Sequence, residues 1–448
     1  MKLKTFSKGG IHPPEHKLSA DKPIEDFGIP KRVTIPLTQH IGATAKATVT
    51  KGDRVLTGQL IGVSNGFISA NVHSSVTGKV VKLDNIIDVS GFARPAVVID
   101  CEDADEWVPE IDTSDVIKKE CSLSAKDIVT KISDAGIVGL GGATFPSHVK
   151  FMIPEGKKAE CLVINGVECE PYLTADHRLM LEQGEQLMLG ASILMKAINV
   201  PLCYIGIENN KKDAIAHLEK LSKDYNGVRI VPLKVKYPQG GEKQLIKAVT
   251  GKEVPSGALP LSVGAVVSNV GSVVAVYEAV QKNKPLVERI VTVTGKGLAK
   301  HLNLRVRVGT PIEELLERAG GLPVNAGKVI SGGPMMGRVI SKLSAPSAKG
   351  VSGVLVLDEK ESKRPDWGAC IRCCKCTTVC PMGLEPHLLM VLSEKAMWAK
   401  TEAEKVMDCI ECGSCSYTCP ANRPLLDYIR LGKKEAGNII KERNSAKV

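Results

Sequence analysis

The sequence of 448 residues is poor in aromatic residues and has no long hydrophobic run. Its 3 tryptophans, 7 tyrosines and 6 phenylalanines make up 4% of the chain, which is too few for a surface that stacks nucleic-acid bases. The most apolar long window, residues 261–280, contains serines, an asparagine, two glycines and a glutamate, whereas a membrane-spanning helix needs about 20 predominantly apolar residues. We therefore expect no nucleic-acid partner and no transmembrane helix.

The sequence also lacks a strong excess of one charge and a secretory signal. The formal net charge is +10 at pH 7, a mild basic excess that gives little reason to expect a nucleic acid. The first ten residues include lysines and lack the apolar segment of a signal peptide. We expect a protein that is soluble, or attached to a membrane only through a partner.

Cysteine, by contrast, is abundant and unevenly distributed. Nine of the 14 cysteines lie between Cys370 and Cys419. Eight of them form two runs with the spacing Cys-x2-Cys-x2-Cys-x3-Cys-Pro, the pattern of bacterial ferredoxins, in which three thiolates of a run bind one [4Fe–4S] cluster and the fourth binds the other. A disulfide scaffold is usually a short, secreted protein, whereas this chain is long and lacks a secretory signal. The pattern therefore predicts two iron–sulfur clusters rather than disulfides.

This rule predicts crossed ligation of the two clusters. The first cluster takes Cys370, Cys373, Cys376 and Cys419. The second cluster takes Cys409, Cys412, Cys415 and Cys380. Structural zinc is the alternative, but four cysteines and a trailing proline in each run exceed what a zinc ribbon needs. Cys374 is out of phase with its run, and we interpret it as a non-ligand, with an alternative ligand or a redox-labile thiol as the other interpretation.

Residues 30–100 contain short β segments separated by turns. Residues 52–59 and 75–80 resemble the two halves of a lipoyl- or biotinyl-type barrel-sandwich domain. In that family, a lysine in the turn between the halves carries the prosthetic group, and here Asn71, Val72 and His73 occupy that turn. We expect a barrel-sandwich-like β domain that carries no swinging arm.

From about residue 120, apolar strands alternate with helical segments. Strands are expected at 161–164, 202–207 and 228–233, a pattern typical of a parallel α/β sheet. Residues 287–345 follow as strands and one helix, which suits a β-grasp module. Thr310, with Pro311 as the first helical residue, predicts the start of that helix.

A glycine-rich loop is the second unusual feature of the sequence. Residues 136–150 contain four glycines and end at Lys150. Glycines allow backbone N–H groups to approach a phosphate or a planar ring, and a lysine adds a cation. A tight turn without a ligand is the alternative, because the loop lacks the Gly-x-Gly-x-x-Gly spacing of the dinucleotide fingerprint.

Four motifs in one order resemble the NADH-oxidising flavoprotein subunit of respiratory complex I. They are the glycine-rich loop, residues 162–171 with Asp176 and Arg178, residues 237–242, and residues 266–270. The β-grasp region that ends in Gly332, Gly333 and Pro334 resembles the same family's soluble-ligand-binding β-grasp (SLBB) domain. With residues 9–14 and the cysteine runs, nearly the whole chain resembles the C subunit of the Rnf complex, a membrane-bound ferredoxin:NAD oxidoreductase that couples electron flow to Na⁺ or H⁺ transport.

The resemblance implies a multidomain α/β protein with four domains. They are an N-terminal barrel-sandwich-like β domain (residues 1–115), a Rossmann-like α/β domain for FMN and NADH (116–284), an SLBB β-grasp domain (285–358) and an α-helical two-cluster ferredoxin-type domain (359–448).

The resemblance also assigns residues to the flavin and the nucleotide. The FMN and its phosphate would be held by Gly139, Gly141, Gly142 and Lys150, with Gly240 in the matching loop. Asn165 and Asn269 would hold polar atoms of the flavin or its ribityl chain, and Glu168 would face the flavin site. Phe145 would stack on a nicotinamide or adenine ring. Glu170 and Glu242 would bind nucleotide hydroxyls.

The chain departs from the complex I pattern in four places. Val167 stands where an aspartate is expected, Gly241 where an acid is expected, and Ser268 where an asparagine is expected. Tyr172 and Leu173 replace a glycine and a threonine. These changes remove polar contacts to the flavin, so the affinity and pose of FMN are open.

By this resemblance, the chain is a peripheral electron-transfer subunit on the cytoplasmic face of the membrane. It exchanges electrons between NAD(H), FMN and two [4Fe–4S] clusters, and it needs no catalytic acid or base. The expected partners are the other Rnf subunits, especially the iron–sulfur B subunit and the flavin-bearing subunits, with ferredoxin reached indirectly. The alternatives are a soluble relative that feeds electrons from NADH to a reductase, and a flavin-free iron–sulfur relay.

Overall fold

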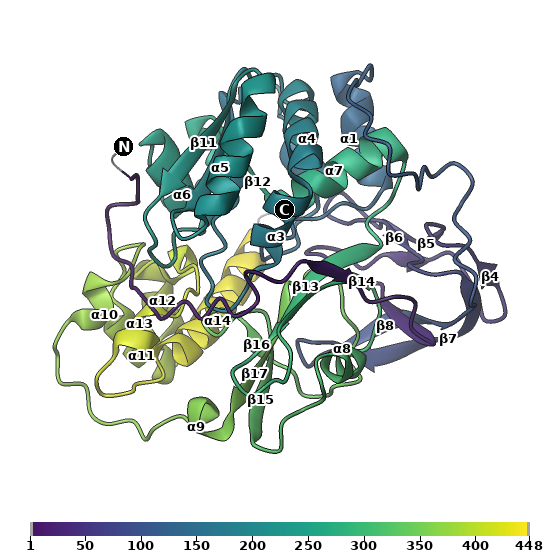
Figure 1. The fold of residues 1–448 in the computed structure, drawn as a ribbon. Helices are drawn as coiled ribbons and strands as arrows, with labels where there is room; N and C mark the ends of the chain where they lie inside the picture. Colours follow the sequence, from purple (N-terminus) through teal and green to yellow (C-terminus); the bar gives the residue numbers. More distant parts are fainter. Residues whose placement is uncertain (1–2, 446–448) are drawn as a thin grey trace.

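The computed structural model describes residues 3–445, which form four modules around a common centre (Figure 1). Within the described residues, no helix combines the length and apolar character needed to cross a membrane. The N-terminal module consists of two antiparallel sheets, ordered β2-β8-β7-β4 and β3-β5-β6. Its strands are β2 (Arg32–Pro36), β3 (Lys46–Ala47), β4 (Arg54–Val55), β5 (Leu60–Val63), β6 (Val72–His73), β7 (Gly78–Ile87) and β8 (Ala93–Cys101). Alternating side chains such as Val33 and Ile35 fill the core between the sheets.

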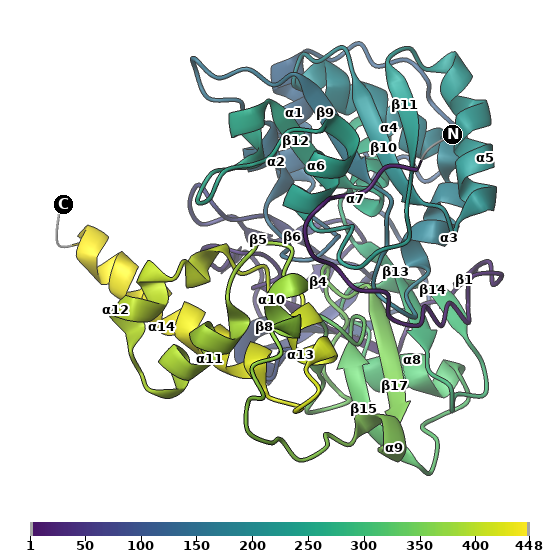
Figure 2. The same ribbon diagram turned by 90° about the vertical axis from the view of Figure 1, so that its left-hand side faces the viewer.

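Between residues 3 and 26, the N-terminal segment pairs with other modules rather than with these two sheets. Lys4 bridges to Leu233 and Ile11 bridges to Tyr237, both in the α/β module. Strand β1 (Ile24–Asp26) pairs with a strand of the SLBB sheet. The N-terminal segment therefore crosses the centre of the molecule, as the purple ribbon in Figure 2 shows.

The α/β module contains a parallel sheet ordered β11-β10-β9-β12, as the alternation of strands and helices predicted. Its strands are β9 (Cys161–Asn165), β10 (Cys203–Glu208), β11 (Val228–Leu233) and β12 (Ala265–Asn269). Its helices are α1 (Ala125–Asp134), α2 (Ser147–Phe151), α3 (Ala175–Glu182), α4 (Gly184–Ala197), α5 (Lys212–Leu221), α6 (Glu242–Thr250) and α7 (Val270–Lys282), with short 3₁₀ turns η1 (Ser222–Asp224) and η2 (Pro260–Val263).

The parallel sheet is buried on both faces. Leu162 and Ile164 join the larger apolar core on one face, whereas Cys161 and Val163 join a second core on the other. This explains the uninterrupted apolar strands in the sequence. Because the strands are parallel, Asn165 and Asn269 end β9 and β12 at the same edge.

The SLBB module is a six-stranded mixed sheet ordered β1-β14-β13-β17-β15-β16. Its elements are β13 (Glu288–Thr294), β14 (Leu302–Arg307), α8 (Ile312–Arg318), β15 (Ala326–Ser331), β16 (Arg338–Val339) and β17 (Gly353–Asp358), followed by the one-turn helix α9 (Glu359–Ser362). The expected helix is present, but Pro311 is its N-cap residue rather than its first helical residue. The hydroxyl of Thr310 donates to the carbonyl oxygen of Arg307, so it does not cap the helix.

The C-terminal module is helical and lies beside the SLBB sheet, beneath the α/β module in Figure 1. Its elements are α10 (Lys375–Thr378), α11 (Pro386–Glu394), α12 (Trp398–Ala403), η3 (Val406–Asp408), α13 (Ser414–Thr418) and α14 (Leu425–Ser445). The segment between the cysteine runs is interrupted by left-handed residues Ala396 and Lys405, with φ of 52° and 60°. This division lets α11 and α12 both pack on α14.

Candidate cofactor-binding site

Four cysteines from both runs meet at one cavity in the C-terminal module. Cys409, Cys412 and Cys415 come from the second run and Cys380 from the first. Apolar side chains such as Leu389 complete the wall. These four residues are the set that the spacing predicted for the second cluster. We call them the inner cysteine set.

The surroundings of the inner set fit a multi-iron cluster. Within residues 3–445, no three His, Cys, Asp or Glu side chains are placed to share a single metal ion, whereas the four sulfurs surround a cavity. Backbone N–H groups approach the sulfurs: Leu384 donates to Cys380 Sγ and Glu411 to Cys409 Sγ, both at 3.4 Å. Burial raises the pKa of the Cys409 thiol to about 11, a cost that binding as an iron-bound thiolate would remove.

The remaining predicted ligands form an outer cysteine set, which is much more exposed. Cys370 and Cys373 lie on the surface, in a loop whose residues 363–375 are all exposed. Cys376 and Cys419 are half-buried and pack on the same apolar core. Burial, and to a smaller extent nearby Cys419, raises the pKa of Cys376. The structure therefore brings the two runs together at this set as well, through its half-buried members.

Cys374 differs from its neighbours in the run. It has a left-handed backbone with φ of 59° and is the N-cap residue of the short helix α10. Its thiol is exposed and points to the carbonyl oxygen of Arg372, with 3.7 Å between the two atoms. The structure does not group Cys374 with the inner set.

The glycine-rich loop presents unused N–H groups. Gly139 donates to the carbonyl oxygen of Phe145 at 2.9 Å, and Leu140 donates to Ser272 Oγ at 2.8 Å. Within residues 3–445, the N–H groups of Gly141 and Gly142 donate to no backbone carbonyl. A Cβ at Gly141 would lie 3.1 Å from the Cβ of Asn269, whereas Gly142 faces open space. Free N–H groups on a glycine turn fit a phosphate.

Polar side chains from neighbouring strands reach the same edge of the sheet. Asn165 Nδ2 donates to the carbonyl oxygen of Gly240 at 2.8 Å. Asn269 caps α7 by accepting from the N–H of Gly271 at 2.8 Å, and its Nδ2 donates to Asp176 Oδ2 at 2.7 Å. The glycine loop, Asn165, Gly240 and Asn269 therefore lie together, and we call this group the flavin edge.

A lysine and a glutamate complete the flavin edge. Lys150 on α2 pairs with Glu242, the first residue of α6, with 3.3 Å between Nζ and Oε1. Lys150 also donates to the carbonyl oxygen of Val267 at 3.4 Å. Both side chains are partly exposed, so a ligand can reach them. Phe145 is half-buried in the loop, and its stacking role stays a prediction.

Glu168 and Glu170 are engaged by the protein itself. Glu168 accepts from the N–H groups of Asp176 at 2.8 Å and His177 at 3.1 Å, at the start of α3. Glu170 accepts from the N–H groups of Met335 at 3.1 Å and Met336 at 2.8 Å. Burial raises the pKa of Glu170 to about 7. The SLBB loop thus occupies the carboxylate of Glu170, and the assignment of Glu170 to nucleotide hydroxyls stays a prediction.

The departures from the complex I pattern have structural counterparts. Val167, at the position of an expected acid, is buried in the apolar core. Gly241 is the N-cap residue of α6, and Ser268 is buried near the end of β12. Tyr172, at the position of an expected glycine, has φ of 70°, so a bulky side chain adopts a backbone conformation that glycine tolerates more easily.

Two side chains that sequence reasoning missed connect the flavin edge to the inner cysteine set. The hydroxyl of Tyr237 donates to the carbonyl oxygen of Cys412 at 2.8 Å. Cys169 Sγ accepts from the N–H of Gly240 at 3.4 Å and packs against the cluster of Tyr237 and Cys412. Tyr237 was part of a recognised motif, but nothing in its spacing indicated a contact 175 residues further along the chain.

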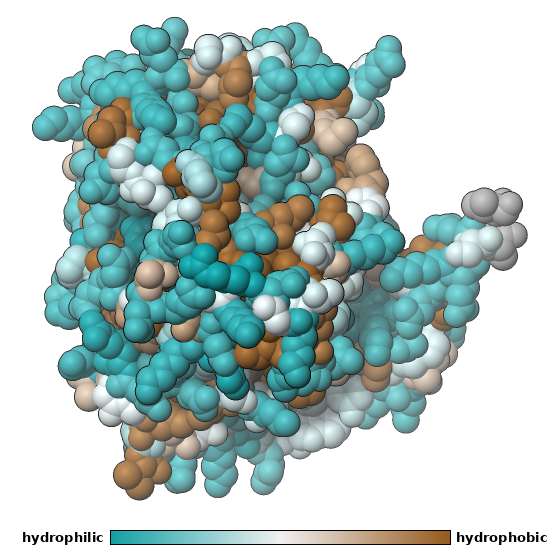
Figure 3. All heavy atoms as spheres, turned by 90° about the vertical axis from the view of Figure 1, so that its right-hand side faces the viewer, coloured by the Kyte–Doolittle hydropathy of each residue, from teal (hydrophilic) through white to brown (hydrophobic). Residues whose placement is uncertain are grey.

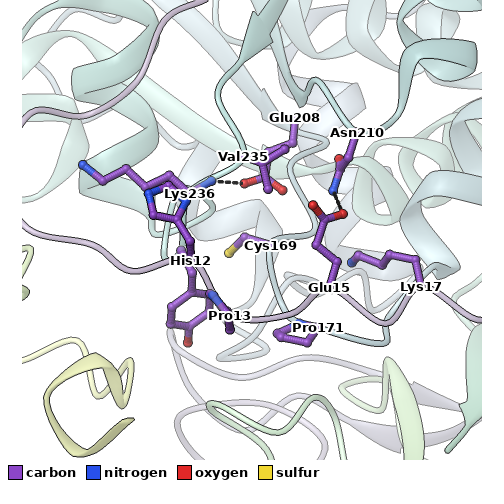
Figure 4. Close-up of a pocket in the computed structure, with 11 residues that line it drawn as sticks. His12, Pro13, Glu15, Lys17, Cys169, Pro171, Glu208, Asn210, Val235 and Lys236 are labelled. Carbon is purple, nitrogen blue, oxygen red and sulfur yellow. Dashed lines mark hydrogen bonds between the residues drawn. The ribbon is translucent and has the colours of Figure 1, made fainter. Parts of the chain in front are cut away.

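A cavity of about 220 Å³ lies beside this connection (Figure 4). Its wall includes His12, Glu15 and Lys17 from the N-terminal segment, with Cys169 and Glu208 from the α/β module. Lys17 Nζ donates to the carbonyl oxygens of residues 168, 170 and 173. Burial lowers the pKa of Lys17 to about 8. The N-terminal segment thus supports the loop that carries Glu168 and Cys169.

Four family descriptions match successive parts of the chain. Residues 4–104 match the RnfC barrel sandwich hybrid domain, residues 132–278 the Nuo51 FMN-binding domain, residues 290–339 the SLBB domain, and residues 363–420 a 4Fe-4S dicluster domain. In solved structures, an NAD⁺-reducing [NiFe]-hydrogenase has a similar fold, with a TM-score of 0.51 and 18% identity over 69% of this chain and 62% of that chain.

Curated relatives match over almost the whole length. The C subunit of the proton-translocating ferredoxin:NAD(+) oxidoreductase complex of Clostridium ljungdahlii is 46% identical over 438 residues, which cover 97% of this chain and 94% of the relative. Its counterpart in the Na(+)-translocating complex of Acetobacterium woodii is 45% identical, covering 96% of both chains. The C subunit of the ion-translocating oxidoreductase complex of Rhodobacter capsulatus is 39% identical over 86% of this chain and 75% of the relative. This chain belongs to the RnfC family, the C subunits of ion-translocating ferredoxin:NAD⁺ oxidoreductase complexes.

Proposed function

We propose that this chain is the subunit through which NAD(H) exchanges electrons with the other subunits of an ion-translocating ferredoxin:NAD⁺ oxidoreductase complex. The observation that carries the proposal is the contact between the flavin edge and the inner cysteine set. Tyr237 and Cys169 join the two sites, because the side chains of Tyr237, Cys169 and Cys412 pack in one apolar cluster.

The residues at the flavin edge fit FMN. The N–H groups of Gly141 and Gly142 would hold the phosphate, with Lys150 as the nearby cation. Asn165 and Asn269 would hold polar atoms of the ring or its side chain. When bound, FMN exchanges a hydride with NAD(H) and single electrons with iron–sulfur clusters. The chain itself binds and orients the reactants, so no side chain is required as an acid or a base.

The two cysteine sets would hold one electron-transfer cluster at an inner position and one at an outer position. The inner set has apolar walls, which keep water away from the thiolates. Two members of the outer set, Cys370 and Cys373, lie on an exposed loop. This loop carries Arg372 and Lys375 among its charged residues, with Trp367 and Ile371 as exposed apolar side chains. A basic surface with apolar anchors suits an acidic electron-transfer partner.

We therefore assign the outer set to contact with a partner subunit. The proposed partners are the iron–sulfur B subunit and the flavin-bearing subunits, with ferredoxin acting through them. The proposed location is peripheral, on the cytoplasmic face of the membrane. The three domain boundaries expected from the sequence, after residues 115, 284 and 358, are part of the same proposal.

The test is anaerobic purification with iron, sulfide and flavin measured together, followed by titration with NADH. We expect about eight irons, from two four-iron clusters, one FMN per chain, and bleaching of both chromophores by NADH. Protein with eight irons, no flavin and no NADH-dependent dye reduction would be a flavin-free relay and would contradict the proposal.

A variant at the flavin edge tests the nucleotide assignment separately. Glu242→Ala removes the partner of Lys150, and we expect NADH-dependent dye reduction to fall by about tenfold, the loss typical of one charged contact. Iron content should stay unchanged. Glu253→Ala is a matched control, because Glu253 is an exposed glutamate in the same region. Wild-type reduction in Glu242→Ala protein would show that the assignment is wrong.

A further inference from the structure

Two buried cations of the SLBB module reach the glycine-rich loop. Lys349, in the segment between β16 and β17, is 1% exposed, and its Nζ donates to the carbonyl oxygen of Gly136 at 2.8 Å. Arg289, on β13, is 3% exposed, and its Nη2 donates to the carbonyl oxygen of Leu140 at 2.8 Å. The SLBB module therefore holds the loop at two carbonyl groups, four residues apart.

Lys349 has an unusual environment for a buried lysine. Its Nζ also donates to the carbonyl oxygen of Asn71 at 2.9 Å, in the turn of the N-terminal module. No carboxylate within residues 3–445 forms an ion pair with it, and burial alone lowers its pKa to about 7. The side chain thus joins three modules through backbone carbonyls only, at a desolvation cost that an exposed lysine does not have.

Two glycines, one in the glycine-rich loop and one next to Lys349, lie close to the opposite segment at this contact. Gly136 has φ of 62°, and a Cβ there would lie 2.2 Å from the carbonyl oxygen of Asn71 and 2.9 Å from Lys349 Nζ. At the other end of the loop, a Cβ on Gly350 would lie 2.7 Å from the Cγ2 of Thr144. The segment that carries Lys349 therefore touches the loop at both ends, and at Gly136 a side chain would collide with the backbone of Asn71.

The orientation of a peptide group explains what these contacts do. The C=O and N–H of a trans peptide point in opposite directions. When Arg289 holds the carbonyl oxygen of Leu140 on the SLBB side, the N–H of Gly141, which belongs to the same peptide group, points away from the SLBB module. Gly141 packs against Asn269, so this N–H is presented at the flavin edge.

We propose that Lys349 and Arg289 are positioning residues for the phosphate of the flavin, holding the glycine-rich loop so that its N–H groups face the ligand. The proposal rests on the proposed function and deepens it. It gives the SLBB module of this chain a role as the rigid support of a phosphate site. The face of the molecule that Figure 3 shows is mostly hydrophilic, with apolar side chains gathered near its middle. Lys349 and Arg289 are themselves buried in the interior.

The experiment compares FMN with riboflavin, which lacks the phosphate. Protein with intact clusters, freed of flavin, is titrated with each compound, and quenching of flavin fluorescence gives the two dissociation constants. Lys349→Met and Arg289→Met should each weaken FMN binding by about tenfold, as expected when a buried hydrogen bond to the loop is lost and its carbonyl acceptor is left without a partner. Riboflavin binding should change little. Lys342→Met removes an exposed lysine of the same module and should leave both constants at wild-type values.

Three results would overturn the inference. FMN binding at wild-type strength in both variants would show that the cations do not position the loop. Equal weakening for FMN and riboflavin would show a general structural defect rather than a phosphate effect. Failure of the wild-type protein to bind FMN would refute the proposed function together with this inference, whereas the first two results refute the inference alone.

A measurement on the wild-type protein covers the case in which the variants do not fold. Hydrogen exchange is followed in peptides that span residues 137–145, with no ligand, with riboflavin and with FMN. We expect FMN to slow exchange in this segment and riboflavin to have a much smaller effect. Equal protection by the two compounds would contradict the assignment of these N–H groups to the phosphate.

Discussion

The two cysteine sets have the same spacing in the sequence but opposite surroundings in the fold. The inner set lies in an apolar cavity next to the α/β module, whereas two members of the outer set lie on an exposed loop. The spacing of ligands thus predicts the type of cluster, and the module against which each run packs decides how far that cluster is from solvent. From this difference we assign the inner set to electron exchange within the chain and the outer set to electron exchange with a partner subunit.

The largest expected effect comes from breaking the crossed ligation. Cys380 belongs to the first run but lies with the inner set. Cys380→Ser should therefore remove the second cluster and leave the first, lowering the iron content from about eight to about four. Cys374→Ser is the matched control, because that thiol is exposed and out of phase, and it should retain all the iron. Low-temperature electron paramagnetic resonance identifies the surviving cluster, and loss confined to the first cluster would disprove the crossed arrangement.

The next effect concerns the rate at which the two clusters lose iron. Exposed thiolates give a chelator or an oxidant direct access, whereas the apolar walls of the inner cavity exclude both. Exposure of the isolated subunit to a ferrous-iron chelator should therefore release iron in two phases of about equal amplitude, with the faster phase from the outer set. A single phase for all the iron would show that the two sets are equally accessible.

A smaller effect is expected at the contact between the inner set and the flavin edge. Tyr237→Phe removes the hydroxyl that donates to the carbonyl oxygen of Cys412. A donor near a cluster stabilises its more negative reduced state, so its loss should lower the reduction potential of the second cluster by on the order of 20 mV. The potential of the first cluster should not change. Redox titration monitored by electron paramagnetic resonance measures both potentials. Tyr204→Phe provides a control, because Tyr204 lies near the amino end of β10 in the parallel sheet.

Local features of this fold were predictable from the sequence because they depend on neighbours along the chain. Ser124 is the N-cap residue of α1, and its hydroxyl accepts from the N–H of Asp127 at 3.2 Å, a contact between residues three apart in the chain. The alternation of strands and helices predicted the parallel sheet, and its parallel direction placed Asn165 and Asn269 at one edge. Because each cysteine run is a local motif, its spacing predicted the inner set, which the structure places around one cavity, while ligation by the outer set stays a prediction.

The contacts that join the modules were not predictable, because they link residues far apart in the sequence. Lys349 and Gly136 are 213 residues apart, and no pattern in either segment indicates the other. Glu170 belongs to a recognised motif, yet its carboxylate binds a loop 165 residues away. The path of residues 4–26 across three modules depends on the same kind of contact. The exact domain boundaries therefore stay predictions.

The last prediction concerns a change that should leave both cysteine sets intact. Burial lowers the pKa of Lys349 from 10.5 to about 7, so between these values the unfolded chain holds a proton that the folded chain has released. The free energy of unfolding should therefore rise with pH in this window, by at most about 1.4 kcal/mol per pH unit from this one group. His40 and His73 face the same amino group, but burial lowers their pKa values, so they stay neutral in this window and add no slope. Lys349→Met should flatten the pH dependence of urea unfolding between pH 7 and 9. The buried Lys17 contributes equally to the wild-type protein and the variant, so its effect cancels in the comparison.

An unchanged slope would mean that Lys349 keeps its proton in the folded chain. A change in iron content would mean that the glycine-rich loop and the cysteine sets are not independent.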